Sequence, residues 1–406
     1  MKHAAAIAVT GLGLVTAAGV GARDTWERLC AGAPTAALDP DLAGLPVPFA
    51  CRVPQAALRA AAPGPAWRTD PFIRFAVAAA REAVADAGLD HGSWDGPRVA
   101  VVIGVGSASH DLTPRASAAL AAHHYAAIPP TLVARSAPNM AAGYVGMALG
   151  AEGPTLCTST ACASGTTAIG TAALLLRAGM CDIAVAGGSE GAGRVTSAAF
   201  WRMGALSTRT HDPLGASRPF DADRDGFVLG EGAGVLVLER AADARARRAR
   251  PHALLTGYGA SGDAHHATAP HPEGAGVQRA LRCAIADAGL SPEDIDHVNA
   301  HATATTLNDR VEAQALRAVF GTPPPVTATK SVLGHSLGAA GAIEAVVSAL
   351  TLRHQLIHPT ANLHRLDDAI DLDVVTKEPR AARVRAMVTT SCGFGGQNAA
   401  LVLQEC

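Results

Sequence analysis

The chain alternates short β-branched runs with alanine-rich stretches of helical periodicity, and it does so twice. In the first part, the runs 7–10, 98–103 and 182–186 are predicted strands, and 75–88 and 163–179 are predicted helices. After residue 251 the alternation begins again. Continuous apolar strands that alternate with helices predict an α/β fold, with a buried sheet covered by helices on its faces.

The second round of alternation sets the predicted domain organisation. Its predicted strands are 253–257, 297–300, 386–390 and 399–403, and its predicted helices are 276–289, 309–320 and 341–353. The first round also holds a strand at 234–238 and a basic helix at 241–250. Because 406 residues exceed the usual size of one core, we predict two halves, residues 1–250 and 251–406. The restart indicates an internal duplication, and the halves are expected to share one interface.

Composition excludes several classes of function. A net charge of −2 gives no electrostatic reason to expect nucleic acid as a partner. No run reaches the ~20 apolar residues that a membrane helix needs. Residues 4–20 imitate a signal peptide, but Gly11, Gly13 and Gly19 interrupt them, which favours a buried strand turning into a loop. The eight cysteines include no C-x-x-C pair, so we expect free thiols in a reducing cytoplasm.

Two motifs are weak in their context. Residues 257–262 match G-x-G-x-x-G, but two prolines follow instead of the helix that a dinucleotide site requires. His265, His266 and His271 lie in a proline-rich loop without a helical i, i+4 pair, so a pocket or surface loop is favoured over a metal site.

A stronger alternative is a serine hydrolase or acyltransferase that uses Ser336. Residues 334–338 match the G-x-S-x-G nucleophile elbow. That elbow needs a buried strand leading directly into the serine. The preceding TKSVL segment is short and contains Lys330, and more small residues follow before a helix can begin.

Cys162 is a candidate nucleophile. It lies in TSTACASG, where small neighbours permit a tight turn, and a predicted helix follows it. The free N–H groups at the start of a helix favour a thiolate by ~0.3–1 kcal/mol, and by up to ~2 kcal/mol when partly buried. The alternative is a buried structural cysteine.

Other segments add polar groups of the kind that a thiol site uses. His301 follows a predicted buried strand, at the strand end where α/β proteins usually place their sites. Lys330, His335 and Glu344 lie within fifteen positions of one another. Two histidines and a lysine in small-residue loops, together with Cys162, predict a thiol site with hydrogen-bond donors.

Several motifs in order resemble the β-ketoacyl-acyl-carrier-protein synthases. They are TACASG, PFDADRDGFVLGEGAGVLVLE, HATAT, TKSVLGHSLGAAGAIE and CGFGGQNA. The resemblance covers essentially the whole chain and is greatest to the elongating, KAS II-like branch and the ketosynthases of type II polyketide pathways. It implies the thiolase-like fold: two duplicated βαβαβαββ halves in a five-layered αβαβα architecture. The first half then carries the nucleophile and the second the two histidines.

The resemblance implies a decarboxylative Claisen condensation. Cys162 would accept an acyl chain from the phosphopantetheine of an acyl carrier protein. His301 and His335 would then hydrogen-bond the malonyl thioester as carbon dioxide leaves. The backbone N–H groups of Cys162 and Phe394 would form the oxyanion hole, worth ~2.7–4 kcal/mol per donor. No cofactor and no metal are implied beyond the carrier-bound substrates.

Further roles are implied by position. Lys330 would orient the catalytic loop, with Glu344 as its partner. The implied substrate-binding residues are Thr303, Thr305, Phe200, Phe394, Cys392, Ser107 and Thr268. Acidic carrier proteins need cations for docking, for which Arg68 and Arg209 are candidates, whereas Gly204 stands where the family often has an arginine.

Some positions depart from the family pattern. Ala302 replaces the usual glycine after the first histidine, so a positive φ there would strain the loop. Cys392 replaces a bulky aromatic residue, Gln397 replaces a common threonine, and residues 107–109 are small. These departures predict a roomier acyl pocket, and hence a specialised ketosynthase for long or unsaturated chains.

The resemblance also leaves assembly open. The family is usually dimeric, and this chain is expected to form a homodimer or a heterodimer with a chain-length-factor subunit. A catalytically silent partner subunit is a further alternative, although such subunits lack the nucleophile that Cys162 provides. Thiolases carry a second cysteine near the position of Cys392, and the initiating KAS III branch has Cys-His-Asn in place of Cys-His-His.

Overall fold

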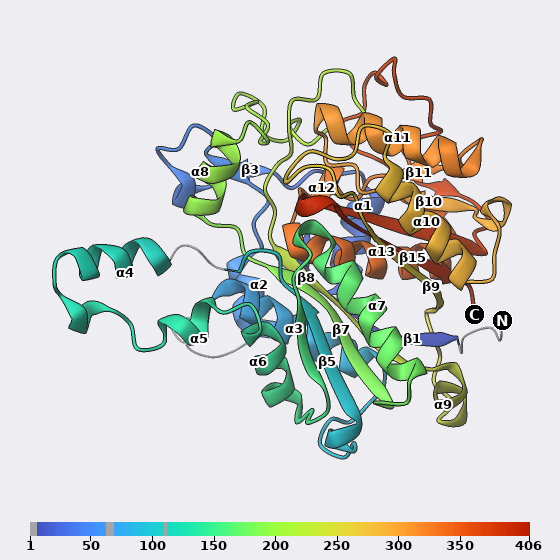
Figure 1. The fold of residues 1–406 in the computed structure, drawn as a ribbon, viewed down its shortest axis with the longest axis horizontal. Coiled ribbons are helices and arrows are strands. Elements are labelled where there is room, and N and C mark those ends of the chain that lie inside the picture. Colours follow the sequence, from blue (N-terminus) through green and yellow to red (C-terminus); the bar gives the residue numbers. More distant parts are fainter. Residues whose placement is uncertain (1–5, 62–68, 109–111) are drawn as a thin grey trace.

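The computed structural model describes residues 6–61, 69–108 and 112–406. Two sets of strands and helices, shown blue to green and yellow to red in Figure 1, pack side by side. The first set is β1 (Ile7–Thr16), α3 (Pro71–Asp86), β5 (Val99–Gly104), α6 (Met140–Leu149), β6 (Thr155–Thr158), α7 (Ser164–Arg177), β7 (Ile183–Glu190) and β8 (Gly232–Arg240). The second is β9 (Ala253–Gly262), α10 (Ala275–Asp287), β10 (His297–Asn299), α11 (Thr306–Phe320), β11 (Val326–Thr327), α13 (Ala340–His354), β14 (Ala386–Gly393) and β15 (Gln397–Gln404).

Both sets follow the order βαβαβαββ and have the same strand arrangement. The sheet orders are β6-β5-β7-β8-β1 and β11-β10-β14-β15-β9, so in each the third strand is followed by the second, fourth, fifth and first. The inner strands β5 and β10 pair in parallel with their neighbours, whereas β8 and β15 pair antiparallel. Pairing of β1 with β9 joins the two sheets at one end.

The helices make five layers with these sheets. Helix α3 covers the outer face of the first sheet, and α10 covers the outer face of the second, with α11 against it. Helices α7 and α13 lie between the sheets and contact both each other and strands. The predicted αβαβα thiolase-like architecture is therefore confirmed. The predicted boundary between residues 250 and 251 lies in the connection from α9 (Ala241–Ala246) to β9.

Smaller elements decorate these layers. They are β2 (Gly19–Val20), α1 (Ala22–Cys30), β3 (Ala37–Leu38), β4 (Phe49–Ala50), α2 (Gln55–Ala61), α4 (Leu112–Ala121), α5 (Leu132–Ser136), α8 (Arg194–Arg202), α12 (Lys330–Leu333), β12 (Leu356–Ile357) and β13 (Arg380–Ala381). Helices α4 and α5 form an arm that extends from the body at the left of Figure 1. In the described part of the chain, no helix is both long and apolar enough to cross a membrane.

Glycines expected to end strand β1 instead lie inside it. A Cβ at Gly11 would lie 2.0 Å from the carbonyl oxygen of Ala83, and one at Gly13 would lie 1.9 Å from that of Ala79. The bare backbone therefore lets α3 pack directly on the strand, and the strand continues to Thr16 rather than turning at Thr10. The second half repeats this, since Gly257 and Gly259 of β9 approach α10 in the same way.

Close approach also fixes the central layer. A Cβ at Gly165 of α7 would lie 2.8 Å from Ala342 Cβ, and one at Gly341 of α13 would lie 1.9 Å from Thr166 Oγ1. The two helices therefore meet through their glycines, each near its own N-terminus. Ser391 Oγ of β14 hydrogen-bonds Thr166 Oγ1 at 2.7 Å across the same contact.

We predict that Gly341→Ala lowers the free energy of unfolding by about 1–3 kcal/mol, because the methyl group overpacks this contact. Chemical denaturation measures the effect. Gly143→Ala is the matched control: it also lies in a helix, but a Cβ there meets nothing within 4 Å. That substitution should be neutral or stabilising by about 0.5–1 kcal/mol. Equal effects of the two substitutions would contradict the prediction.

Candidate active site

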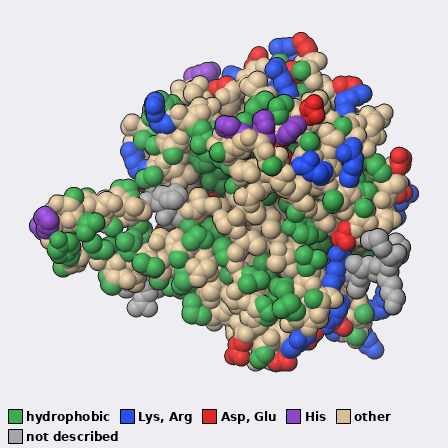
Figure 2. Space-filling view, in the orientation of Figure 1, with side chains coloured by type: hydrophobic (Ala, Val, Ile, Leu, Met, Phe, Trp, Pro, Cys, Tyr) green, Lys and Arg blue, Asp and Glu red, His purple; other side chains and the backbone are tan. Residues whose placement is uncertain are grey.

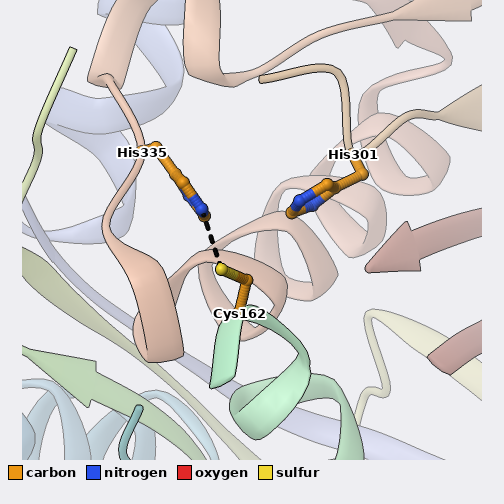
Figure 3. Close-up of side chains that lie close together, drawn as sticks. All are labelled: Cys162, His301 and His335. Carbon is orange, nitrogen blue, oxygen red and sulfur yellow. Dashed lines mark hydrogen bonds between the residues drawn. The ribbon is translucent and has the colours of Figure 1, made fainter. Parts of the chain in front are cut away.

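Cys162 and two histidines meet at the centre of the molecule. Cys162 lies in the turn just before α7, and the Nε2 atom of His335 lies 3.1 Å from its Sγ (Figure 3). The His301 and His335 rings are 5.3 Å apart and nearly perpendicular. One ligand atom from each of the three residues lies within 4.8 Å of the others, so all three can contact a single small group. They come from both halves of the chain, as expected.

The His301 loop is held by a buried carboxylate. The backbone N–H groups of His301 and Ala302 donate to the two oxygens of Glu312 at 2.8 and 2.7 Å. Thr390 donates its hydroxyl to Glu312 at 2.7 Å and lies 3.1 Å from the His301 nitrogen. Ala302 has φ 32° and Ala304 has φ 67°, so the expected positive φ at Ala302 is present. An L-residue in this region is strained, and the Glu312 contacts compensate for it.

His335 is positioned by backbone and an aromatic ring. The backbone N–H of His335 donates to the Val228 carbonyl at 2.8 Å, and the His335 carbonyl accepts from the N–H of Gly230 at 2.9 Å. The Phe227 ring lies edge-to-face with the imidazole, 5.2 Å between centroids. These contacts fix the imidazole so that Nε2 faces the sulfur.

Lys330 and Glu344 form a buried ion pair behind the histidines, as the sequence predicted. Burial raises the pKa of Glu344 to about 7, and the adjacent Lys330 ammonium opposes that rise. The Lys330 carbonyl also accepts a 2.7 Å hydrogen bond from Ser217. The pair therefore places a positive charge close to the site without contacting solvent.

Burial keeps the resting site uncharged. It raises the pKa of the Cys162 thiol to about 12, although Lys330 and the N–H groups of Phe394 and Cys162 act in the opposite direction. Burial and Lys330 lower the pKa of both His301 and His335 well below the usual range. The start of the helix favours the thiolate as predicted, but the loss of water has the larger effect on the pKa of Cys162.

A cavity of about 390 Å³ opens at the three residues. Seven predicted substrate or catalytic residues line it besides Cys162 and His335: His301, Thr303, Thr305, Phe200, Phe394, Cys392 and Thr268. Ser107, also predicted to bind substrate, is not among the described residues that line this cavity. Its N–H instead donates to Glu190 at 3.1 Å, which places it behind the site. The N–H groups of Cys162 and Phe394 both lower the pKa of the Cys162 thiol, so both donors lie at the nucleophile, and their role as an oxyanion hole stays a prediction.

Three positioning residues were not predicted. Glu312 and Phe227 hold the histidines as described above. Glu190, at the end of β7, accepts the N–H groups of Gly106 at 2.7 Å and Gly338 at 3.1 Å, and so joins loops of both halves. Burial raises the pKa of Glu190 to about 7. Glu190 and Phe227 stand out in the sequence as an acidic and an aromatic residue next to glycines, whereas nothing distinguishes Glu312 from the other polar residues of its helix.

Comparison with known proteins agrees with this geometry. Residues 4–244 match the family model of the β-ketoacyl synthase N-terminal domain, and residues 252–364 match that of its C-terminal domain. The chain belongs to the β-ketoacyl synthase family. With the thiolase-like fold and the Cys162, His301 and His335 cluster, it is a ketosynthase, an acyltransferase that joins acyl units by condensation.

Curated relatives match most or nearly all of the chain. The chain is 38% identical over 411 residues to 3-oxoacyl-acyl-carrier-protein synthase 2 of Coxiella burnetii, with 98% of each covered. It is 42% identical over 344 residues to the enzyme of that name from Staphylococcus aureus, covering 84% of this chain and 83% of the relative.

Among solved structures, the ishigamide ketosynthase/chain length factor aligns with TM-score 0.93 at 36% identity, covering 99% of both chains. A type II PKS ketosynthase in complex with its acyl-carrier protein and bound to the hexaketide aligns with TM-score 0.92 at 29% identity, also covering 99% of both chains.

The alternative motifs take other places in the ketosynthase. Residues 257–262 lie inside strand β9, so no phosphate-binding turn forms there. Ser336 is buried in the turn after His335, and no strand of the described chain leads into it. His266 and His271 accept backbone N–H groups of their own loop, at 3.1 and 3.2 Å. Within the described ranges, the only metal-sized grouping is Cys162, His301 and His335.

The two carrier-docking candidates fare differently. Arg68 lies outside the described residues. Arg209 is half-buried and donates to the Asp223 carbonyl at 3.1 Å. It follows the loop of Met203, Gly204 and Ala205, which lines the cavity. Arg209 itself is not among the residues that line the cavity, and its role in docking stays a prediction.

We predict that Ala302→Gly stabilises the ketosynthase by up to about 1 kcal/mol, since glycine removes the strain of the positive φ. Urea denaturation measures this. Ala300→Gly is the matched control, because Ala300 is buried in the same loop without a positive φ. It should destabilise by at least about 0.5 kcal/mol. A loss of stability in both variants would contradict the strain at Ala302.

We also predict how Cys162 reacts with iodoacetamide. With a thiol pKa of about 12, the thiolate fraction rises about tenfold per pH unit below that value. The alkylation rate at Cys162, followed by mass spectrometry, should therefore keep rising between pH 7 and pH 10. A plateau near neutral pH would instead indicate a thiolate–imidazolium pair.

Proposed function

We propose that Cys162 carries the growing acyl chain and that His301 and His335 activate a malonyl unit on an acyl carrier protein. The observation that carries this proposal is the convergence of one thiol and two neutral imidazoles on one cavity. In the first step Cys162 Sγ attacks the carrier thioester. The proton of the Cys162 thiol is transferred to the leaving pantetheine sulfur, so a thioester and a free carrier thiol result.

In the second step the malonyl thioester loses carbon dioxide. Its carbonyl oxygen accepts hydrogen bonds from Nε2 of His301 and His335, which stabilise the enolate as the carboxylate leaves. Neutral imidazoles suit this role because each keeps an N–H donor, and burial holds both in that form at neutral pH.

The enolate carbon then attacks the Cys162 thioester carbonyl. The resulting oxyanion accepts the N–H groups of Cys162 and Phe394, and the carbon–sulfur bond breaks. The released sulfur takes up one proton, so each turn consumes a proton and yields carbon dioxide, a β-ketoacyl carrier and the free thiol. Lys330, held by Glu344, adds positive potential that favours both anions.

The cavity supports a division of substrates. Phe200, Phe227 and Phe394 form an aromatic wall, with Phe200 5.2 and 6.2 Å from the other two rings. Cys162 belongs to the same apolar cluster as Phe227, so the acyl chain is assigned to this wall. Thr303 and Thr305, whose hydroxyls lie 3.1 Å apart, are assigned to the pantetheine arm.

The proposed reaction needs no metal and no further cofactor. A thiol and two imidazoles are good zinc ligands. However, the buried Lys330 ammonium acts on all three groups and disfavours a second cation. The reactive groups for both steps are already provided by the chain and the carrier-bound substrates.

An acyl carrier protein and a second subunit are the proposed partners. Strand β6 is an exposed sheet edge, and its Leu156 is 41% exposed. The arm of α4 and α5 bears exposed apolar side chains, including Tyr125 and Val133 (Figure 2). We assign these surfaces to a dimer, either of two copies or with a chain-length-factor subunit, located in the cytoplasm. The ishigamide neighbour, a ketosynthase with a chain length factor, supports the second form.

We propose that this ketosynthase belongs to a specialised type II pathway, in which the carrier is a separate protein, rather than to fatty acid synthesis. The solved neighbours at TM-scores of 0.93 and 0.92 support this, while the curated relatives are named 3-oxoacyl-acyl-carrier-protein synthase 2. The two halves, 1–250 and 251–406, are proposed to descend from one duplicated unit, since their topology and their glycine contacts repeat.

We predict that Cys162→Ala abolishes both acyl-enzyme formation and condensation, whereas Ser336→Ala retains both. Intact-protein mass spectrometry after incubation with an acyl-carrier thioester measures the first, and product analysis with malonyl carrier measures the second. If Ser336→Ala lost the acyl adduct while Cys162→Ala kept it, the serine alternative would be correct. If the wild type itself formed neither the acyl adduct nor product, the chain would be a silent partner subunit.

A further inference from the structure

The cavity has a second wall that the acyl chain does not use. Strand β14 alternates its side chains, so Thr390 and Cys392 share one face while Ser391 and Gly393 share the other. Ser391 contacts Thr166 of α7, and a Cβ at Gly393 would lie 3.3 Å from the Cys162 nitrogen. The Ser391 and Gly393 face therefore points to the nucleophile.

The opposite face points to His301. Thr390 lies 3.1 Å from the His301 nitrogen, and Cys392 follows it on the same face. Cys392 also pairs across the ladder with Asn398, and both residues line the cavity. Cys392 packs on the apolar cluster that contains Ala302 and Phe220. It is thus the wall of the cavity on the His301 side.

The Cys392 side chain is small and uncharged. Burial raises the pKa of its thiol well above the usual range, and the imidazole at 3.1 Å belongs to Cys162 instead. Within the described chain no hydrogen bond is made by its sulfur, and it therefore behaves as a small apolar group. Thr268 and Ala269 are other small residues that line this cavity.

This wall faces the entering unit rather than the acyl chain. The two imidazoles fix the carbonyl oxygen of that unit, Thr303 and Thr305 hold its pantetheine arm, and its α-carbon must face Cys162. A substituent on the α-carbon lies in the plane of the enolate, away from the thioester sulfur. It would extend past His301 toward Cys392.

We propose that this ketosynthase accepts extender units that carry a small substituent on the α-carbon, such as a methyl group, and that Cys392 determines that specificity. The inference rests on the proposed function and assigns the roomier pocket to the extender side. A large side chain at residue 392 would fill this space. One methylene group in an apolar pocket changes selectivity by about 10-fold or more.

The test compares malonyl-pantetheine with racemic methylmalonyl-pantetheine on the octanoyl-loaded enzyme, with products quantified by mass spectrometry. The measured quantity is the ratio of branched to unbranched product within each variant. For the wild type this ratio should lie within about tenfold of unity, and Cys392→Phe should lower it at least tenfold. Cys392→Ser, of nearly equal size, is the matched control and should keep the ratio. Cys392→Leu serves as a milder filling variant if Cys392→Phe does not fold.

The outcomes distinguish failure of the Cys392 specificity from failure of the proposed condensation. Unbranched product with a wild-type ratio below one hundredth, or an unchanged ratio in the filling variants, would overturn the specificity and leave the condensation intact. Absence of product from both extenders, despite octanoyl-Cys162, would overturn the proposed function and the inference with it. A ratio lowered in Cys392→Ser as strongly as in Cys392→Phe would assign the effect to thiol chemistry instead of space.

Discussion

The contact between helices α7 and α13 is the constraint on which the site depends. Gly165 and Gly341 let these helices approach until a single methyl group would collide with the neighbour. Cys162 immediately precedes α7, and His335 lies just before α13, so the approach of the helices sets the 3.1 Å separation of sulfur and imidazole. A larger residue at either glycine would move Cys162 away from His335 without altering either reactive side chain. The reactive geometry is therefore a property of the core rather than of mobile loops.

The same close packing removes water, and this decides the charge state of the site. Burial disfavours the thiolate of Cys162 and the imidazolium of His301 and His335 alike, so the resting site is neutral although Lys330 is nearby. Charge then develops during the reaction, on a sulfur, an enolate or an oxyanion. Hydrogen bonds and the Lys330 charge act strongly on such transient anions because no solvent screens them. Exclusion of water raises the free energy of ionising the free thiol. It also strengthens each hydrogen bond that the site donates to the reacting substrate.

Much of this architecture could be predicted from the sequence, and the failures have physical causes. Apolar runs with clear periodicity predicted eight of the ten strands of the two halves, all except β6 and β11, together with the helix that follows Cys162 and the strand that precedes His301. Gly11 and Gly13 were misread as a loop because a strand glycine that admits a helix looks the same in sequence as one that ends the strand. Glu190 and Glu312 were missed because their backbone partners lie far away along the chain or on another loop. Helices α4 and α5 were also missed, since they bury few side chains and so lack a clear apolar stripe. Helix α6 was missed because MAAGYVGMAL has no charged face to reveal its period.

The duplicated halves carry different catalytic side chains at their shared centre, Cys162 from the first and two histidines from the second. In the first half, the strand end equivalent to the His301 loop contains Gly104 and Gly106. A Cβ at Gly104 would lie 2.2 Å from the Ser164 carbonyl, and one at Gly106 would lie 2.6 Å from a Glu190 oxygen. These two positions are therefore restricted to glycine. The turn that presents Cys162 occupies the space where their side chains would lie. The second half carries no nucleophile, and its side of the cavity holds two imidazoles and Cys392. Asymmetry between the halves follows from packing, because one central volume holds the groups for one reaction only.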